Sequence, residues 1–203
     1  LERQGHSVTV VREGDAFYRL SDREYALAPE AGGHGYVQLV CDLEANGRLP
    51  DRIAHLWLVT VDESARPGSN FFNRNQERGF YSLLHLAQAL GGEDVKRPMH
   101  VAVVSNGMQR VGDETLRYPE KATVLGPVGV IPQELPALTL QSIDLAAPAP
   151  GGRLGKRAAL DLGGDLVAKL AADISPLHAD QRVAYRNGQR FVPCKPQAET
   201  DLA

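Results

Sequence analysis

The clearest pattern in the chain is an apolar run, an amphipathic helix and a second apolar run, which follow one another between residues 52 and 104. The runs at 53–61 (IAHLWLVTV) and 99–105 (MHVAVVS) have the length and the β-branched content of strands buried in a parallel sheet. Apolar positions between them recur with helical spacing and predict a helix from about Asn73 to Leu90. Two strands joined by one helix lie parallel with a right-handed crossover. The unit therefore predicts a partly parallel sheet with helices on its faces.

The N-terminal part predicts smaller elements. Residues 1–6 resemble the last turn of a helix capped by Gly5, and a strand is expected at 7–11. Residues 17–27 predict irregular chain with a short strand at 25–27, and a loop at 29–35 precedes a helix that begins near Tyr36. A helix end that feeds a strand implies an earlier strand and helix. We therefore expect residues 1–194 to form one unit whose first strand is missing, within a longer polypeptide.

Alternation of helices and strands continues to the C-terminal region. Pro119 is expected in the first turn of a helix whose inward positions include Ala122, Leu125, Val128 and Gly129, with Pro132 and Pro136 limiting its end. A strand is expected at 137–144, a helix at 160–172 and a hairpin at 182–192, where Asn187 and Gly188 suit a type I′ turn. Residues 195–203 predict a disordered tail. The whole pattern predicts a truncated Rossmann-like α/β fold: a mostly parallel sheet, helices on both faces and a C-terminal β-hairpin.

Composition narrows the possible functions. The 203 residues suit one domain, and 43% hydrophobic with 23% charged residues is ordinary for a globular protein. A net charge of -3 without a basic cluster disfavours binding to nucleic acid or to an anionic membrane. No apolar run has the length of a membrane span and no signal-peptide pattern is present, so we expect a cytoplasmic protein. Cys41 and Cys194 are far apart and predict free thiols, with Cys41 buried on its helix.

Neither glycine-rich segment has the spacing of a phosphate-binding loop. The segment 32–35 (GGHG) lacks the G-x-G-x-x-G pattern and is interpreted as a flexible surface loop. The segment 151–156 (GGRLGK) places its second glycine one residue too early, and Arg157 stands where a Ser or Thr would bind magnesium. It is interpreted as a linker.

Candidate catalytic groups are few. Lys121 lies three positions after Tyr118, whereas a short-chain reductase needs its lysine four positions after the tyrosine. His178 and Asp180 could polarise one another, but the sequence places no nucleophile near them. The other histidines show no metal-pair spacing, and His55 and His85 are expected to be core or hydrogen-bonded residues. Further charged residues are expected to be solvated, with structural roles at most: Glu24, Glu77, Arg78, Asp113 and Glu114.

Short motifs recur in a fixed order along the chain. They are HLW at 55–57, GFYSLLHLAQAL at 79–90, VSNGMQ at 104–109, GDE at 112–114, PEKATVLG at 119–126, VIPQE at 130–134, IDL at 143–145 and VAYRNGQRFV at 183–192. This ordered set resembles the non-catalytic structural subdomain of the ketoreductases of modular type I polyketide synthases. The resemblance covers nearly the whole chain from Gly5 to Pro193.

The resemblance implies a truncated, pseudo-Rossmann half-domain that has lost its cofactor site and that packs against a catalytic half. In that family the catalytic half binds NADPH and reduces a β-ketoacyl group held on an acyl carrier protein. The resemblance therefore implies that this chain is not an enzyme by itself, binds no cofactor, and has the catalytic half and neighbouring synthase domains as partners. No catalytic, cofactor-binding or metal-binding residue is assigned to it.

Two other readings stay open. The chain could be a small stand-alone NADPH-dependent reductase of short-chain-dehydrogenase ancestry, using Tyr118 and Lys121 with a cofactor near residues 105–107. Alternatively, the crevice could persist as a binding site for a carrier arm or an acyl chain.

Overall fold

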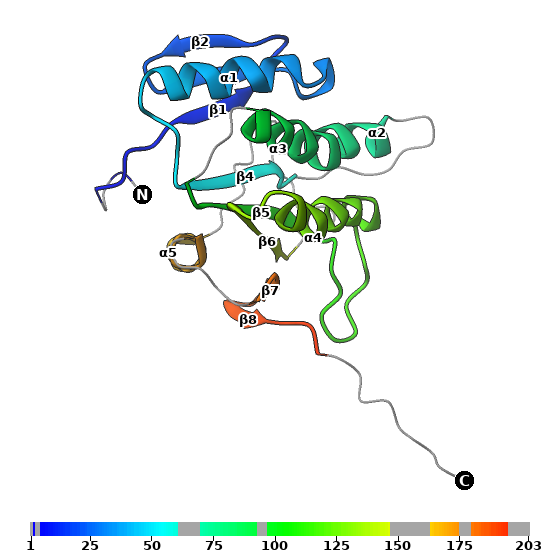
Figure 1. Ribbon diagram of the computed structural model, residues 1–203. Coiled ribbons are helices and arrows are strands. Elements are labelled where there is room, and N and C mark those ends of the chain that lie inside the picture. Colours follow the sequence, from blue (N-terminus) through cyan, green and yellow to red (C-terminus); the bar gives the residue numbers. More distant parts are fainter. Residues whose placement is uncertain are drawn as a thin grey trace.

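The computed structural model describes residues 2, 5–60, 70–92, 97–146, 163–174 and 180–194. The segment 151–156, His178 and the expected tail at 195–203 lie outside these residues. The described chain folds into two sheets that share one hydrophobic core, with helices packed around them (Figure 1).

The larger sheet contains the predicted strand-helix-strand unit. Its strands are adjacent in chain order, the first four parallel and the last antiparallel. They are β4 (Arg52–Leu58), β5 (Met99–Asn106), β6 (Leu138–Leu145), β7 (Arg182–Arg186) and β8 (Gln189–Phe191). Asn187 and Gly188 join the last two with φ angles of 51° and 74°, as a type I′ turn requires. The predicted fold class and the C-terminal hairpin are confirmed.

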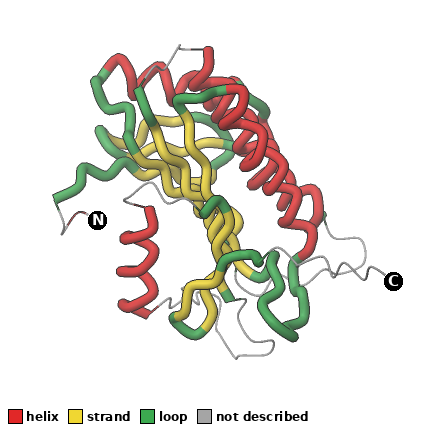
Figure 2. The backbone as a smooth tube through the Cα atoms, turned by 60° about the horizontal axis from the view of Figure 1, so that its bottom comes forward, coloured by secondary structure: helices red, strands yellow, loops and turns green. Residues whose placement is uncertain are grey.

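Helices cover both faces of this sheet. The helices α3 (Ser82–Gly92) and α4 (Leu125–Glu134) pack on the face to which Val101 and Val103 of β5 contribute. The helix α5 (Gly163–Ile174) packs on the opposite face, beside Ala102 and Val104. In Figure 2, a helix at the left stands apart from the long helices that run along the right side of the strands. Covering on both faces explains why every residue of β5 is buried.

The position of α5 changes the hand of one crossover. The chain passes from β4 to β5 and from β5 to β6 over the face of α3 and α4. It then passes from β6 to β7 in the same direction across the sheet, but with α5 on the other face. This third crossover therefore has the opposite hand to the first two, against the usual preference for right-handed connections.

The N-terminal strands form a separate small sheet in the order β1 (Val10–Glu13), β3 (Glu24–Leu27), β2 (Tyr18–Ser21). The strand expected at 7–11 thus lies slightly later in the chain. The prediction of irregular chain before residue 25 is wrong for β2, which pairs antiparallel with β3. The strand has only four residues (YRLS), and although they alternate between apolar and polar, all of them are exposed, so no buried face confirms the pattern.

The short helix η2 (Pro29–Ala31) and α1 (His34–Ala45) follow the small sheet. Tyr25 and Leu27 of β3 are buried in the same core as Tyr36 and Val40 of α1. The Tyr36 ring lies 5.7 Å from the His85 ring of α3, and this contact joins the small sheet and its helix to the larger unit. The glycines at 32–35 are not simply a surface loop, because Gly35 lies in the first turn of α1 against Leu27.

The single helix predicted from about Asn73 to Leu90 is continuous but not uniform. It consists of α2 (Phe71–Asn75), the π-helical segment η3 (Gln76–Tyr81) and α3. Within η3, a Cβ atom added to Gly79 would lie 2.8 Å from Cδ1 of the buried Leu58 in β4. The absence of a side chain at Gly79 thus lets this helix approach the sheet closely.

The helix predicted to begin at Pro119 begins as a 3₁₀ helix, η4 (Pro119–Val124), and continues as α4. Of the four expected inward positions only Val128 is buried; the other three are half-buried, and Lys121 is buried instead. Pro132 lies inside α4 and does not end it, whereas α4 ends at Glu134, two residues before Pro136. Because proline has no N–H, the carbonyl four residues earlier loses its helical donor. That carbonyl, on Val128, accepts a hydrogen bond of 2.9 Å from Nε2 of Gln181.

The contact at Gly79 predicts an unusual response to alanine. Gly79→Ala should lower the free energy of unfolding by about 1–3 kcal/mol, because the new methyl group overpacks against Leu58. Urea unfolding monitored by circular dichroism measures the change. Gly129→Ala is the matched control in α4, where an added Cβ has no atom within 4 Å. It should raise the free energy of unfolding by about 0.5–1 kcal/mol. Equal effects of both substitutions would contradict the role given to Gly79.

Burial of His55 predicts acid sensitivity. Its Nε2 lies 2.8 Å from Oγ of Ser82, and burial lowers the His55 pKa from 6.5 to about 4. The unfolded chain therefore binds a proton between these pH values while the folded chain does not. Stability should be unaffected by this group above pH 6.5 and should fall by about 1.4 kcal/mol for each pH unit from 6.5 down to 4. Unfolding curves of the chain and of His55→Asn across this range test it. The slope of the free energy of unfolding against pH should flatten in His55→Asn. It should persist in the control His6→Asn, since His6 is exposed.

Candidate functional site

The carboxyl ends of β4, β5 and β6 bring together six of the thirteen buried polar or charged residues among those that the structure describes. Ligands of parallel α/β folds bind beyond this edge of the sheet. Here two clusters of hydrogen-bonded residues lie at the edge, one around Lys121 and the other around Asp144. The buried polar residues at this edge are Thr60, Ser105, Asn106, Lys121, Asp144 and Arg186.

The first cluster surrounds the ammonium group of Lys121, a side chain with 0% exposure. Its Nζ donates to Oγ1 of Thr60 at 2.6 Å and to Oδ1 of Asn106 at 2.7 Å. It also donates to the backbone oxygen of Leu58 at 2.9 Å. Asn106 and Thr60 are joined directly as well, because the Asn106 amide donates to the Thr60 carbonyl at 2.7 Å and accepts from the Thr60 N–H at 3.1 Å. Lys121 therefore ties η4 to the ends of β4 and β5.

Tyr118 completes this cluster. Its backbone N–H donates to the carbonyl of Gly107 at 2.8 Å, and its ring centroid lies 4.4 Å from Nζ of Lys121. The ring also lies 5.9 Å from that of Phe71 in α2. A lysine that activates a tyrosine in a reductase acts on the phenol oxygen. Here the ammonium group contacts the face of the ring, an arrangement that stabilises a buried cation.

The second cluster joins the loop after β5 to β6 and β7. The carboxylate of Asp144, with 0% exposure, accepts from Oγ of Ser105 at 2.9 Å and from the backbone N–H groups of Met108 and Gln109 at 3.0 and 3.2 Å. Arg186 donates to this carboxylate at 2.8 Å. Asp144 thus fixes the backbone of the loop that leads away from β5.

Arg186 connects Asp144 to Glu114. Its Nε donates to the two oxygens of the Glu114 carboxylate at 2.8 and 3.0 Å, and its Nη2 donates to the Gln109 carbonyl at 2.8 Å. Burial acts to lower the Arg186 pKa, but the hydrogen bonds and charges of Glu114 and Asp144 outweigh it and raise that pKa. Arg186 stays charged, as a buried guanidinium with two carboxylate partners should. Glu114, expected to be a solvated charge with a structural role at most, anchors this loop through its pair with Arg186.

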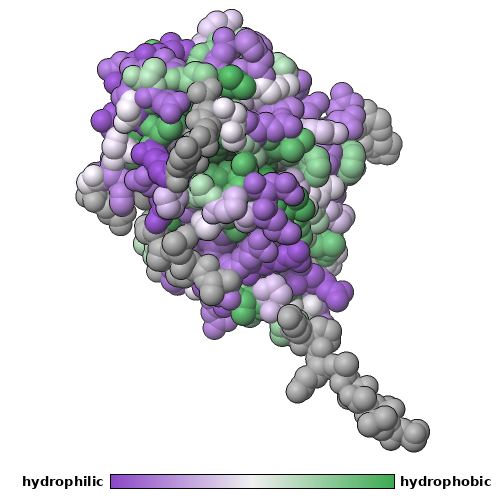
Figure 3. Space-filling model, viewed as in Figure 1, coloured by the Kyte–Doolittle hydropathy of each residue, from purple (hydrophilic) through white to green (hydrophobic). Residues whose placement is uncertain are grey.

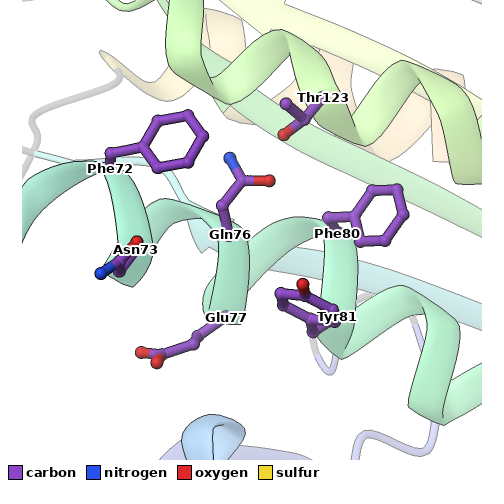
Figure 4. Close-up of a pocket in the computed structure, with 7 residues that line it drawn as sticks. All are labelled: Phe72, Asn73, Gln76, Glu77, Phe80, Tyr81 and Thr123. Atoms are coloured by element: carbon purple, nitrogen blue, oxygen red, sulfur yellow. The ribbon is translucent and has the colours of Figure 1, made fainter.

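A surface groove lies on the helix side of the molecule. It has a volume of about 430 Å³ and is lined mainly by α2 and η3, with Thr123 of η4 on its far wall. Figure 4 shows Phe72, Gln76, Phe80 and Thr123 around one side of the groove, with Glu77 and Tyr81 nearby. Nε2 of Gln76 donates to the Glu120 carbonyl at 3.2 Å. The aromatic walls suit an apolar group, and the π-helical segment that supplies most of them is of a type often found at functional sites.

The structure places the candidates from the sequence as follows. Tyr118 and Lys121 lie beside Asn106 and Gly107, as the stand-alone reductase reading requires, whereas the Ser105 hydroxyl bonds to Asp144. Cys41 is exposed, so the expectation that it is buried is wrong: it lies on the outer side of α1, away from the core face of Tyr36 and Val40. Asp180 pairs with Arg190 at 2.8 Å.

Sequence reasoning missed Asp144 and Arg186 because an aspartate at a strand end and an arginine before a turn are unremarkable singly. The IDL motif at 143–145 was the available signal. Among the residues that the structure describes, no group of three or more His, Cys, Asp or Glu side chains could hold a metal ion. Nor does any helix in the described ranges have the length and hydropathy of a membrane span.

The chain is similar to one family of known proteins and to three solved structures. A family model described as "Beta-ketoacyl synthase-like, N-terminal" matches residues 1–151. A structure of the adenylation, ketoreductase and pseudo Asub parts of a keto acid-selecting NRPS module is 22% identical, with a TM-score of 0.73 over 91% of this chain and 14% of that one. An N-terminal ketoreductase from the macrolactin assembly line is 13% identical, with a TM-score of 0.63 over 87% of this chain and 32% of that one.

The third structure is a C2-type ketoreductase from a modular polyketide synthase. It is 28% identical, with a TM-score of 0.54 over 83% of this chain and 32% of that one. This chain therefore spans between a seventh and a third of the chains it resembles. A search of curated proteins found no match. The comparisons confirm the Rossmann-like fold and the resemblance to the structural part of ketoreductase regions.

The hydrogen bonds of Lys121 predict a large structural cost when the ammonium group is removed. Lys121→Met should lower the free energy of unfolding by about 2–4 kcal/mol, because buried oxygens of Leu58, Thr60 and Asn106 lose a charged donor. Urea unfolding measures it. Lys169→Met is the matched control, since Nζ of Lys169 makes an exposed hydrogen bond to the Gly188 carbonyl. That substitution should change stability by no more than about 0.5 kcal/mol. A Lys121→Met chain as stable as the control would show that the cluster does not hold the sheet edge together.

Proposed function

The chain belongs to the family described as beta-ketoacyl synthase-like, N-terminal, and from this premise we propose that it is the non-catalytic structural half-domain of a ketoreductase in a polyketide synthase module. In this role it packs against the NADPH-dependent catalytic half and stabilises it. The coverage of the comparisons supports the proposal. Most of this chain aligns with about a third of two ketoreductases, as a half-domain within a larger reductase would.

The observation that carries the proposal is the state of Lys121. A catalytic lysine must reach a cofactor or a substrate-activating tyrosine, and its ammonium group is needed at an open site. The ammonium group of Lys121 is instead enclosed, with 0% exposure, and donates to oxygens of Leu58, Thr60 and Asn106. It holds the carboxyl edge of the sheet together, where an active reductase would keep space for a cofactor.

The remaining assignments follow from this role. NADPH belongs to the catalytic half, and the chain itself holds no catalytic or cofactor-binding residue. Its partners are the catalytic half and neighbouring domains of the synthase, which work together in the cytoplasm. The β-ketoacyl substrate and the stereochemistry of its reduction belong to the catalytic half as well.

One observation favours a second candidate, a stand-alone reductase. Tyr118 and Lys121 meet Asn106 and Gly107 at the edge of the sheet where α/β folds bind their ligands. In that reading Tyr118 supplies a proton to the substrate, and Tyr118→Phe abolishes turnover.

An NADPH titration followed by nicotinamide fluorescence separates the two candidates, with a ketoreductase that contains both halves as the positive control. The chain should show no saturable binding at concentrations that saturate the control. Adding the chain to an isolated catalytic half should raise the melting temperature of that half by about 4 °C or more, which corresponds to about 1–2 kcal/mol. Saturable NADPH binding together with turnover that Tyr118→Phe abolishes would replace the proposal with the stand-alone reductase.

A further inference from the structure

The sequence contains three Asn-Gly pairs, and the structure places them in different surroundings. They lie at 46–47 after α1, at 106–107 at the end of β5 and at 187–188 in the turn between β7 and β8. An asparagine that precedes glycine loses its side-chain amide more readily than other asparagines, because no side chain shields the glycine nitrogen from the asparagine Cγ atom. Hydrogen bonds and exposure then decide which of the three pairs can react.

The pair at 46–47 is held by two hydrogen bonds. The side-chain amide of Asn46 donates to the Asp42 carbonyl at 2.6 Å, and the N–H of Gly47 donates to the Glu44 carbonyl at 2.8 Å. Both the group that would leave and the nitrogen that would attack are therefore engaged at the end of α1.

The pair at 106–107 is held more firmly. Asn106 has 0% exposure, and its side-chain amide donates to the Thr60 carbonyl at 2.7 Å. The N–H of Gly107 donates to the Leu145 carbonyl at 3.0 Å. These bonds lie at the buried edge of the larger sheet, so this pair reacts only when the sheet itself opens.

The pair at 187–188 is neither buried nor held in this way. Asn187 and Gly188 are exposed, and among the residues that the structure describes neither the Asn187 side chain nor the Gly188 N–H has a hydrogen-bond partner. The Gly188 carbonyl accepts from Nζ of Lys169 at 2.9 Å, a bond that does not involve the nitrogen. Figure 1 shows the hairpin of β7 and β8 toward the lower end of the molecule, and Figure 3, from the same side, shows hydrophilic residues on this part of the surface.

We propose that Asn187 is a site of spontaneous deamidation. The Gly188 nitrogen attacks Cγ of Asn187 and gives up its proton, the bond between Cγ and the side-chain nitrogen breaks, and that nitrogen leaves as ammonia. Water then adds to either carbonyl group of the resulting five-membered succinimide ring, and the ring opens to aspartate or isoaspartate. Water is the only co-reactant, and no atom is oxidised or reduced. This inference concerns the hairpin alone and is independent of the proposed function.

Local opening of the hairpin makes this reaction possible. The closed type I′ turn holds the Gly188 nitrogen apart from Cγ of Asn187, so the turn must open before the ring can form. The strand β8 lies at the edge of the sheet and has three residues, each paired with β7. Opening of so short a strand costs far less free energy than opening of the sheet around Asn106.

The products change the hairpin in two ways. Isoaspartate adds one CH2 group to the main chain, which a two-residue type I′ turn does not accommodate. Either product also puts a carboxylate next to Arg186, the residue that pairs with Asp144 and Glu114. The hairpin is therefore looser in chains that carry isoaspartate.

Peptide mapping of the intact chain tests the site. The chain is incubated in mildly alkaline buffer and digested with trypsin at intervals, with a digest at time zero as the reference. Mass spectrometry measures the change from amide to acid at each pair, and trypsin cuts on both sides of residues 187–190. In the folded chain Asn187 should react at least about tenfold faster than Asn46 or Asn106. In urea, where no structure protects the pairs, the three rates should lie within about threefold of one another.

A variant separates the effect of the new charge from that of the longer main chain. Asn187→Asp carries the carboxylate on an ordinary main chain. The isoaspartate form, purified from the incubated chain by chromatography, should exchange the amide hydrogens of β8 at least about tenfold faster than Asn187→Asp, with β5 unchanged. Three results would overturn the proposal: a rate at Asn187 no higher than at the other two pairs of the folded chain, rate differences that persist in urea, or equal exchange in β8 of the two forms.

Discussion

Burial of a parallel sheet on both faces is the constraint on which the rest of this structure depends. Because helices cover β5 on each side, polar groups at its carboxyl end cannot reach water and need partners within the protein. Asn106 and Lys121 meet this need at the junction with β4, and Asp144 and Arg186 meet it at the junction with β7. The edge at which related folds bind ligands is here occupied by the protein's own side chains.

This use of the edge supports the half-domain role that we propose. An active site keeps polar groups poised for a ligand, with some hydrogen-bonding capacity left for it. At this edge the ammonium of Lys121 and the carboxylate of Asp144 each contact several protein groups. Such contacts stabilise the sheet and fix the loops around it. In the proposed half-domain, this rigidity would keep constant the surface that faces the catalytic half.

The sequence predicts the larger sheet well and the smaller one poorly, for physical reasons. Strands such as β5 are apolar throughout because both faces are buried, and the turn at Asn187 and Gly188 has local chemistry that suffices to identify it. In contrast, β2 is exposed and owes its structure to pairing with β3. The burial of Lys121 depends on oxygens that lie 15 to 63 residues away along the chain, so no local pattern could reveal it. The expected half-domain role came from the family resemblance, which rests on motifs along the whole chain. Hydrophobic periodicity alone could not indicate that role.

The hydrogen bond from Gln181 to the Val128 carbonyl has a consequence for the order of folding. Pro132 leaves this carbonyl without a helical donor, and the donor that replaces it stands 53 residues later in the chain. During synthesis the last turns of α4 must therefore remain solvated at this point until β7 has been made and has docked beside β6. The hydrogen bonding of α4 is therefore completed only when the C-terminal strands have docked. The helix and these strands thus reach their final structure in the same late step of folding.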